Sequence, residues 1–164
     1  MPIAFDANIL IDLLDRRIKG DRRAKLDNLI EELQKKRTKI LIPTPALTEL
    51  LVHAGKAREA IHQELSCNSL FQITPFDSRA AMECALLLEE ALSAGERRQV
   101  TKTKFKFDWQ IVAIAKSHDA TVIYSDDTDI ARYGKRANLI VIRTDDLPLP
   151  ASELQSKLEF TPQT

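Results

Sequence analysis

Ile3-Ala4-Phe5-Asp6-Ala7-Asn8-Ile9-Leu10-Ile11-Asp12-Leu13-Leu14 is the stretch of the sequence that decides the fold. Three apolar residues run directly into Asp6, and apolar residues then recur at Leu10, Leu13 and Leu14 with helical spacing. This pattern predicts a short buried strand that ends at a carboxylate and is followed at once by a helix. Ligands of open α/β sheets bind outside the carboxyl ends of the strands, which is where we expect Asp6 to lie.

The rest of the chain repeats this alternation of apolar runs and helical patterns. Further short strands are expected at residues 39–42, 70–73, 121–124 and 139–142, each separated from the next by helix-forming sequence. Strands that alternate with helices imply a parallel sheet covered on both faces. We therefore predict an α/β fold, a three-layer α/β/α sandwich around a central parallel sheet of about five short strands.

Length and composition point to one soluble domain. The chain has 164 residues, of which 44% are hydrophobic and 29% charged, and the 24 basic residues balance the 24 acidic ones. This balance does not indicate a nucleic-acid-binding protein, although it does not exclude a local cationic patch. Two isolated cysteines, Cys67 and Cys84, and the lack of a signal-peptide pattern favour a cytoplasmic protein with reduced thiols. No apolar run approaches about 18–20 residues, the length that spans a bilayer.

Acidic residues stand at equivalent places after several of the expected strands. Asp6 follows the first strand, Glu49 follows the second, Asp108 is expected in the first turn of a helix over 107–115, and residues 126–129 (Asp-Asp-Thr-Asp) follow the fourth. Carboxylates that converge on one edge of a parallel sheet stay ionised only if cations join them. Oxygen ligands without histidine or cysteine select a hard divalent ion, Mg²⁺ or Mn²⁺, which activates water for phosphodiester cleavage.

Four segments that contain these acids resemble the motifs of the PIN-domain nucleases, in the same order along the chain. They are Phe5–Leu10 (FDANIL), Leu47–Leu50 (LTEL), Phe107–Ala115 (FDWQIVAIA) and Tyr124–Ile130 (YSDDTDI). The nearest group is that of the VapC-like toxin ribonucleases of toxin–antitoxin pairs. The resemblance implies a nuclease domain over residues 1–143, with residues 144–164 as a C-terminal tail.

The resemblance also implies roles for individual residues. Asp6, Glu49, Asp108 and Asp127 match the catalytic acids of the family. Of these, Asp6, Asp108 and Asp127 would bind Mg²⁺ or Mn²⁺ together with Asp129, while Glu49 would hold or deprotonate the attacking water. The supporting residues would be Asn8, Ser125 and Asp126.

Two residues depart from the family pattern. Asp126 stands where the family has asparagine, and Ile130 stands where it has an aromatic residue. The first departure leaves open which of Asp126, Asp127 and Asp129 bind the metal.

The function that follows from this resemblance is a Mg²⁺- or Mn²⁺-dependent endoribonuclease, the toxin of a toxin–antitoxin pair. Its implied partners are an RNA substrate, such as tRNA or rRNA loops, a protein antitoxin bound to the first helices, and a second copy of the chain in a homodimer. Basic residues just before Asp108 would guide the RNA backbone, although a solvated loop explains them equally well. They are Arg97, Arg98, Lys102, Lys104 and Lys106.

Three alternatives stay open. The first is a PIN-domain nuclease that acts in RNA processing. The second is a module that binds RNA or a partner without catalysis, and the third is a phosphatase like the haloacid dehalogenases. The phosphatase chemistry requires a second aspartate two residues after the first, where this sequence has Asn8, and it gives Glu49 and Asp108 no role.

Overall fold

Five parallel strands form one sheet in the part of the chain that the computed structural model describes, residues 1–95 and 102–152, with backbone only for 102–106. The strand order is β3-β2-β1-β4-β5, which confirms the predicted parallel sheet. The strands are β1 (Ile3–Phe5), β2 (Ile40–Pro43), β3 (Phe71–Thr74), β4 (Val122–Tyr124) and β5 (Ile140–Ile142).

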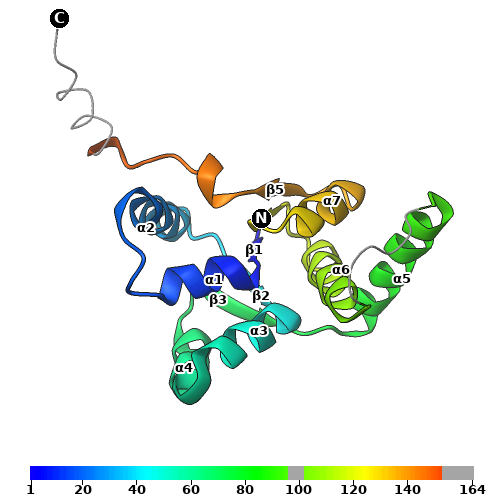
Figure 1. The fold of residues 1–164 in the computed structure, drawn as a ribbon, viewed down its shortest axis with the longest axis horizontal. Helices are drawn as coiled ribbons and strands as arrows, with labels where there is room; N and C mark the ends of the chain where they lie inside the picture. Colours follow the sequence, from blue (N-terminus) through cyan, green and yellow to red (C-terminus); the bar gives the residue numbers. More distant parts are fainter. Residues whose placement is uncertain (96–101, 153–164) are drawn as a thin grey trace, which may run out of the picture.

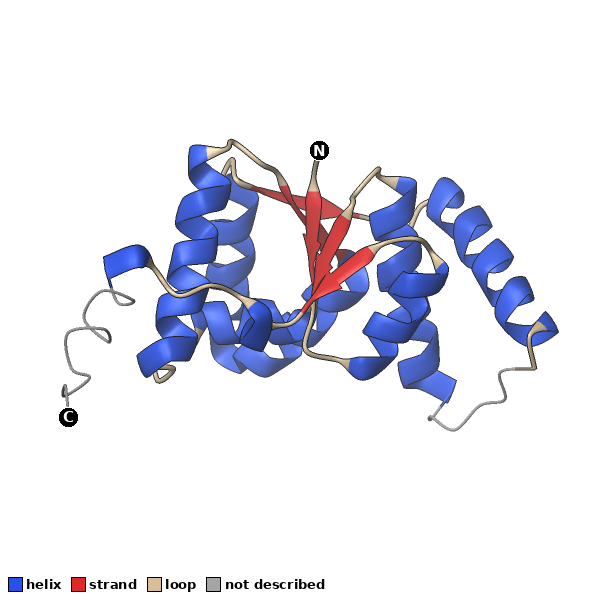
Figure 2. Cartoon of the chain, turned by 90° about the horizontal axis from the view of Figure 1, so that it is seen from above, coloured by secondary structure: helices blue, strands red, loops and turns tan. Residues whose placement is uncertain are grey.

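Helices cover both faces of this sheet, so the predicted three-layer α/β/α sandwich is confirmed (Figure 2). Figure 1 shows α1, α2 and α4 on one side of the strands and α5, α6 and α7 on the other. The helices are α1 (Ala7–Leu14), α2 (Gly20–Lys35), α3 (Thr44–Ala54), η1 (Gly55–Ala57), α4 (Arg58–Cys67), α5 (Ser78–Ser93), α6 (Lys102–Ser117), α7 (Thr128–Arg136) and η2 (Thr144–Asp146).

The central strand β1 explains why the first segment organises the fold. Ala4 and Phe5 are completely buried, and β1 pairs with β2 on one side and with β4 on the other. The chain passes from β1 to β2 in one direction and later enters the sheet again at β4. The carboxyl ends of β1 and β4 therefore flank the point where the strand order reverses, the usual place for a ligand site in this class of sheet.

Helix α6 contains the longest run of completely buried residues among the described helices. Residues 109 and 111–115 have no exposed surface, and the indole of Trp109 stacks on the ring of Tyr133 in α7 with a centroid distance of 4.1 Å. Burial of two large aromatic side chains contributes strongly to stability and fixes α6 against α7. This packing sets the position of Asp108, the residue before Trp109.

Two local expectations for this region need correction. The sequence predicted a helix that begins near residue 107, with Asp108 in its first turn and a solvated loop as one explanation of the basic residues before it, but α6 already begins at Lys102. Asp108 therefore lies in the second turn of the helix. Residues 96–101 lie outside the described residues.

The segment after β5 returns across the surface towards α2. Thr144 and Leu147 are buried, and Lys25 Nζ of α2 donates a hydrogen bond of 2.6 Å to the carbonyl oxygen of Asp145. The first residues of the expected tail thus pack against the sandwich, while 153–164 lie outside the described residues. None of the helices in the described ranges is both long and apolar enough to cross a membrane.

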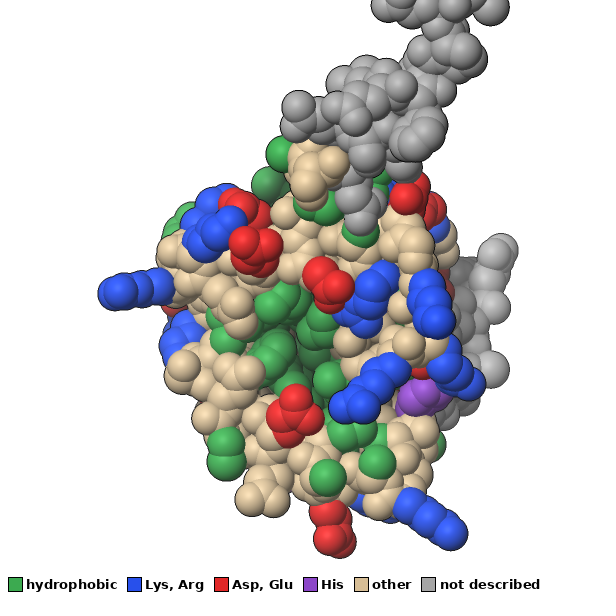
Figure 3. Space-filling model, turned by 90° about the vertical axis from the view of Figure 1, so that its left-hand side faces the viewer, with side chains coloured by type: hydrophobic (Ala, Val, Ile, Leu, Met, Phe, Trp, Pro, Cys, Tyr) green, Lys and Arg blue, Asp and Glu red, His purple; other side chains and the backbone are tan. Residues whose placement is uncertain are grey.

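The surface carries an apolar hollow with charged residues at its border (Figure 3). We call it the α2 groove, because α2 forms one wall and α1, α4 and the start of β3 form the rest. Its apolar floor consists of Leu13, Leu14, Ile30, Leu70 and Phe71. The charged residues that line it are Arg16, Arg23, Asp27, Glu31 and Glu64.

The contact between α7 and β5 gives a stability prediction. Gly134 is buried in α7, and a Cβ atom added there would lie 2.5 Å from Val141 Cγ2. Alanine is more favourable than glycine inside a helix by about 1 kcal/mol, but overpacking of a core typically lowers the free energy of unfolding by about 1–3 kcal/mol. We expect Gly134→Ala to lower the free energy of unfolding measured in urea, and to cost less in a Val141→Ala background. Equal costs in the two backgrounds would contradict this close packing.

Candidate metal centre

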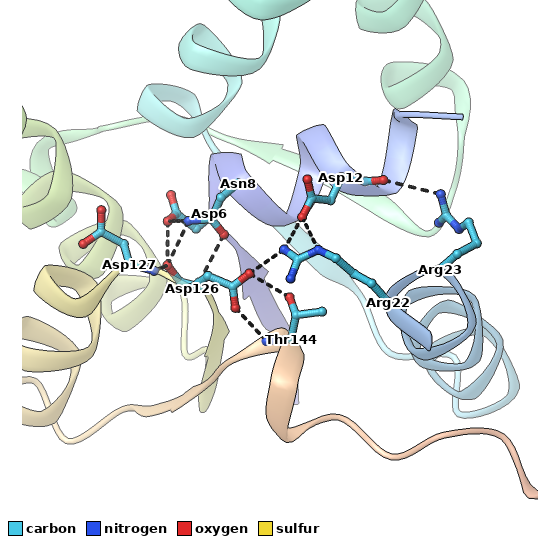
Figure 4. A network of polar contacts seen from close by, with 9 residues as sticks. Asp6, Asn8, Asp12, Arg22, Arg23, Asp126, Asp127 and Thr144 are labelled. Carbon is cyan, nitrogen blue, oxygen red and sulfur yellow. Dashed lines mark hydrogen bonds and ion pairs between the residues drawn. The ribbon is translucent and has the colours of Figure 1, made fainter. Parts of the chain in front are cut away.

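Asp6 is the N-cap of α1 and lies at the carboxyl end of β1. Its Oδ1 accepts a hydrogen bond of 2.7 Å from the backbone N–H of Ala7, and only 5% of the residue is exposed. Its Oδ2 accepts hydrogen bonds from Ser125 Oγ at 2.6 Å and from Asn8 Nδ2 at 2.8 Å (Figure 4). The carboxylate is therefore held by both central strand ends, β1 and β4.

The environment of Asp6 opposes its negative charge. Burial is the largest effect and raises the pKa, the hydrogen bonds from Ser125, Ala7 and Asn8 lower it, and the nearby charge of Asp127 raises it. The net result is a pKa above the ordinary value for an aspartate. A cation bound nearby would favour the ionised form of this carboxyl group.

The turn between β4 and α7 brings further carboxylates to the same place. Ser125 is completely buried, and its Oγ accepts a hydrogen bond of 3.0 Å from the N–H of Asp127. Asp127 is the N-cap of α7, where its Oδ1 accepts a hydrogen bond of 2.7 Å from the N–H of Asp129. One serine hydroxyl thus links Asp6 to the start of α7.

Asp108, Asp127 and Asp129 form a group of carboxylates that would suit a metal ion. One oxygen from each lies within 4.8 Å of the others, and Asp108 is 5% exposed while the other two are half-buried. A set of carboxylate oxygens fits Mg²⁺, Mn²⁺ or Ca²⁺ and is poorly suited to softer metals. Asp6 is outside this group of three, although its pKa responds to the charge of Asp127.

The members of this group also have partners in the fold. Arg132 Nη2 lies 3.1 Å from Asp129 Oδ1 and donates a hydrogen bond of 3.0 Å to the hydroxyl of Tyr133. Burial raises the pKa of Tyr133, and the charges of Asp129 and Asp108 raise it further, which places this hydroxyl near the carboxylates. Arg132 therefore partly balances the negative charge of the group.

Asp126 faces a different set of partners. Its Oδ1 accepts a hydrogen bond of 2.7 Å from the N–H of Thr144, and its Oδ2 accepts one of 2.9 Å from Thr144 Oγ1 and lies 2.7 Å from Arg22 Nη2. Burial raises the pKa of Asp126, but the hydrogen bonds from Thr144 and Arg22 outweigh it and lower the pKa below the ordinary value. The structure thus groups Asp127 and Asp129 with Asp108 and directs Asp126 elsewhere.

Asn8 connects these parts. Its amide nitrogen donates to Asp6 and, at 3.3 Å, to Ser125 Oγ, while its Oδ1 accepts a hydrogen bond of 3.2 Å from the N–H of Asp126. The side chain therefore bridges the ends of β1 and β4, in keeping with a supporting position beside the acids.

The remaining sequence-predicted residues are not members of this group, or they fall where the structure does not describe the side chain. Glu49 is exposed on α3, a helix that packs against α1 and α6, and it is outside the group of three. Arg97 and Arg98 lie outside the described residues. Lys102, Lys104 and Lys106 belong to the first turns of α6, where the structure describes the backbone alone.

Sequence reasoning missed Arg22, Arg132, Tyr133 and Thr144. Arg22 and Arg132 lie among the charged residues of amphipathic helices, where most such residues are solvated. The one available signal was Asp126, because an additional carboxylate in an acidic site needs a compensating partner. Nothing in the sequence indicated which basic side chain would pair with Asp126.

Comparison with known proteins identifies one family and a set of structures with the same fold. The PIN domain family model matches residues 3–136. FitAcB from Neisseria gonorrhoeae is 21% identical, with a TM-score of 0.64 over 88% of this chain and 99% of that chain. VapBC2 from Rickettsia felis, bound to a DNA fragment from their promoter, is 20% identical, with a TM-score of 0.63 over 87% of this chain and 98% of that chain.

DNA-bound VapBC from Salmonella typhimurium is 17% identical, with a TM-score of 0.60 over 88% of this chain and 98% of that chain. No curated protein sequence matches the chain. At these identities, the likeness to the solved structures shows a shared fold.

The carboxylate group predicts stabilisation by a divalent ion. Ligand binding at about 100 times its Kd raises the free energy of unfolding by about 2.7 kcal/mol, so Mn²⁺ should raise the melting temperature of the protein. Asp127→Asn should abolish most of this rise while keeping a residue that caps α7. The control is Glu59→Gln, which removes an exposed carboxylate on α4. An equal Mn²⁺ effect in Asp127→Asn and in the control would exclude this group as the ion site.

The raised pKa of Asp6 predicts how this stabilisation depends on pH. Without metal, ionisation of a buried acid with a raised pKa lowers stability as pH rises through that pKa, and a bound cation reverses this cost. Protons therefore compete with Mn²⁺, and the rise in melting temperature should shrink on acidification, starting above the ordinary aspartate pKa. Ser125→Ala removes a hydrogen bond that lowers the pKa, so the decline should move to higher pH. A decline that stays in place or moves to lower pH would contradict this coupling.

Proposed function

This chain belongs to the PIN-domain family of nucleases, and we propose that it is an endoribonuclease that depends on Mg²⁺ or Mn²⁺. The observation that carries the proposal is the meeting of Asp108, Asp127 and Asp129 beside buried Asp6, at the carboxyl ends of the two central strands. Phosphate groups are anionic, so a site made of carboxylates admits one only when a cation is present.

Four aspartates from different segments would bind such a cation. Asp108, Asp127 and Asp129 would contribute oxygens from α6 and α7, and Asp6 would contribute from β1. When bound, Mg²⁺ or Mn²⁺ supplies positive charge that lowers the pKa of a water molecule and stabilises the anionic phosphate in the transition state. Ser125 and Asn8 keep the Asp6 carboxylate in place through their hydrogen bonds.

Glu49 is the proposed general base. It is exposed on α3, and this helix packs against α1 and α6, the helices that follow Asp6 and carry Asp108. A carboxylate in this position can take a proton from a water molecule that attacks phosphorus. Hydrolysis of this kind breaks the bond to one ribose oxygen and, as in the family, would leave a 3′-hydroxyl and a 5′-phosphate.

The backbone of α6 supports a path for the RNA. Lys104 lies four residues before Asp108, about 6 Å along a helix that rises about 1.5 Å per residue. The backbone positions of Lys102, Lys104 and Lys106 stand within two helical turns before Asp108, and Arg97 and Arg98 precede them in the chain. Carboxylates repel the phosphate backbone of RNA, and basic side chains beside them would attract it.

We further propose that the protein is the toxin of a toxin–antitoxin pair and that its antitoxin inserts a helix into the α2 groove. The structural neighbours include a toxin–antitoxin complex from Klebsiella pneumoniae, which is 22% identical and has a TM-score of 0.58. The groove offers an apolar floor with both signs of charge at its border, which suits an amphipathic helix. Occupation by a second copy of this chain is the alternative outcome of a binding test.

The catalytic proposal predicts metal-dependent cleavage of RNA. Purified protein incubated with a structured RNA pool and Mn²⁺ should cut it, and EDTA should stop the reaction. Asp108→Asn should lower the cleavage rate by more than about 100-fold, the upper end of the effect of residues that only support metal ligands. The control variant is again Glu59→Gln. Cleavage that persists in EDTA or in Asp108→Asn would refute the mechanism.

The docking proposal predicts the effect of charge in the groove. The toxin proposal expects a small reading frame directly upstream of the gene, and its product should copurify with the chain when the two are coexpressed. Ile30→Glu should disrupt the complex because Ile30 lines the groove, whereas Val52→Glu, at an exposed apolar position on α3, should not. A complex that survives Ile30→Glu, or a self-complex at the same surface, would contradict the antitoxin assignment.

A further inference from the structure

Arg22 joins three parts of the chain at the border of the carboxylate site. From α2, its Nε lies 2.8 Å from Asp12 Oδ2 on α1, and its Nη2 contacts both Asp12 Oδ2 and, at 2.7 Å, Asp126 Oδ2 in the turn after β4 (Figure 4). The Asp12 and Asp126 side chains are 20% and 23% exposed. The guanidinium is thus the shared counterion of two mostly covered carboxylates.

These contacts, together with Thr144, occupy both oxygens of Asp126. Thr144 donates one hydrogen bond to each oxygen, and Arg22 contacts Oδ2. The side chain of Asp126 therefore turns towards α2 and the segment after β5, while the next residue, Asp127, caps α7 and joins the acidic group. Neighbouring aspartates in one turn thus have separate environments.

We propose that Arg22 is a positioning residue that holds the Asp126 carboxylate away from the metal ligands and so fixes the turn that presents Asp127. This inference rests on the proposed metal-dependent activity. Without the guanidinium, Asp126 would be a partly buried carboxylate with no counterion, close to a site that attracts cations. It would then turn towards a bound ion and join Asp127 as a further ligand.

The experiment compares Arg22→Met, which removes the charge and keeps an apolar stem, with the same change in an Asp126→Asn background. The measured quantities are the Kd of Mn²⁺ and its electron paramagnetic resonance spectrum in the absence of RNA, and kcat and KM for RNA cleavage. Arg17→Met is the matched control, because Arg17 forms an exposed ion pair with Asp15 at 2.9 Å. Thermal unfolding verifies that each variant folds.

We expect Arg22→Met to bind Mn²⁺ more tightly, with an altered spectrum, because a further carboxylate joins the ion. We also expect kcat to fall about tenfold with little change in KM, as for loss of a residue that orients metal ligands. Both effects should be much smaller when Asp126 is already asparagine. If Arg22→Met does not fold, Arg22→Lys should show the same changes at smaller size, since lysine lacks the planar fork of donors.

Each other outcome is decisive. An arginine that only links α2 to the sheet would lower stability, leave the Mn²⁺ spectrum unchanged and give the same loss with or without Asp126→Asn, and this result would overturn the inference. Mn²⁺ binding and cleavage that are identical in wild type and Arg22→Met would also overturn it. Failure of the wild-type protein to bind Mn²⁺ would instead contradict the proposed function on which the inference rests.

Discussion

The hydrogen bond from Ser125 to Asp6, 2.6 Å long, is the interaction on which the rest of the site depends. A carboxylate at the end of a buried strand needs donors, and β4, which pairs directly with β1, supplies one. The same serine accepts from the N–H of Asp127, and Asp127 in turn begins α7. Pairing of the two central strands thus brings Asp6 beside the turn that carries Asp127, and the packing of α6 on α7 adds Asp108.

Three aspartates of this region have a part in the fold. Asp6 caps α1, Asp127 caps α7, and Asp126 anchors the segment at Thr144. Their mutual repulsion opposes folding, and the packing of Trp109 on Tyr133 holds α6 and α7 together against it. Asp6, Asp126 and Asp127 are therefore held by contacts of the fold itself, and a bound cation would compensate the negative charge that gathers beside them.

Much of the fold was predictable because all of its strands except β3 are unbroken apolar runs. Residues 3–5 and 40–43 are buried on both faces of the sheet, so their sequences needed no alternation to identify them. The start of α6 was missed because Lys102–Lys106 carry no apolar face strong enough to indicate a helix. The acids at the strand ends were visible in the sequence, but the different orientations of Asp126 and Asp127 were not, because they depend on Arg22 and Thr144, 104 and 18 residues away from Asp126.

Crystals of the protein soaked in Mn²⁺ and measured at the manganese absorption edge would locate the ion. We expect an anomalous peak bound by oxygens of Asp108 and Asp127, beside Asp6, with the Asp126 side chain still on Arg22 and Thr144. An anomalous map with no peak among these carboxylates, or with its peak at a different surface, would contradict this expectation.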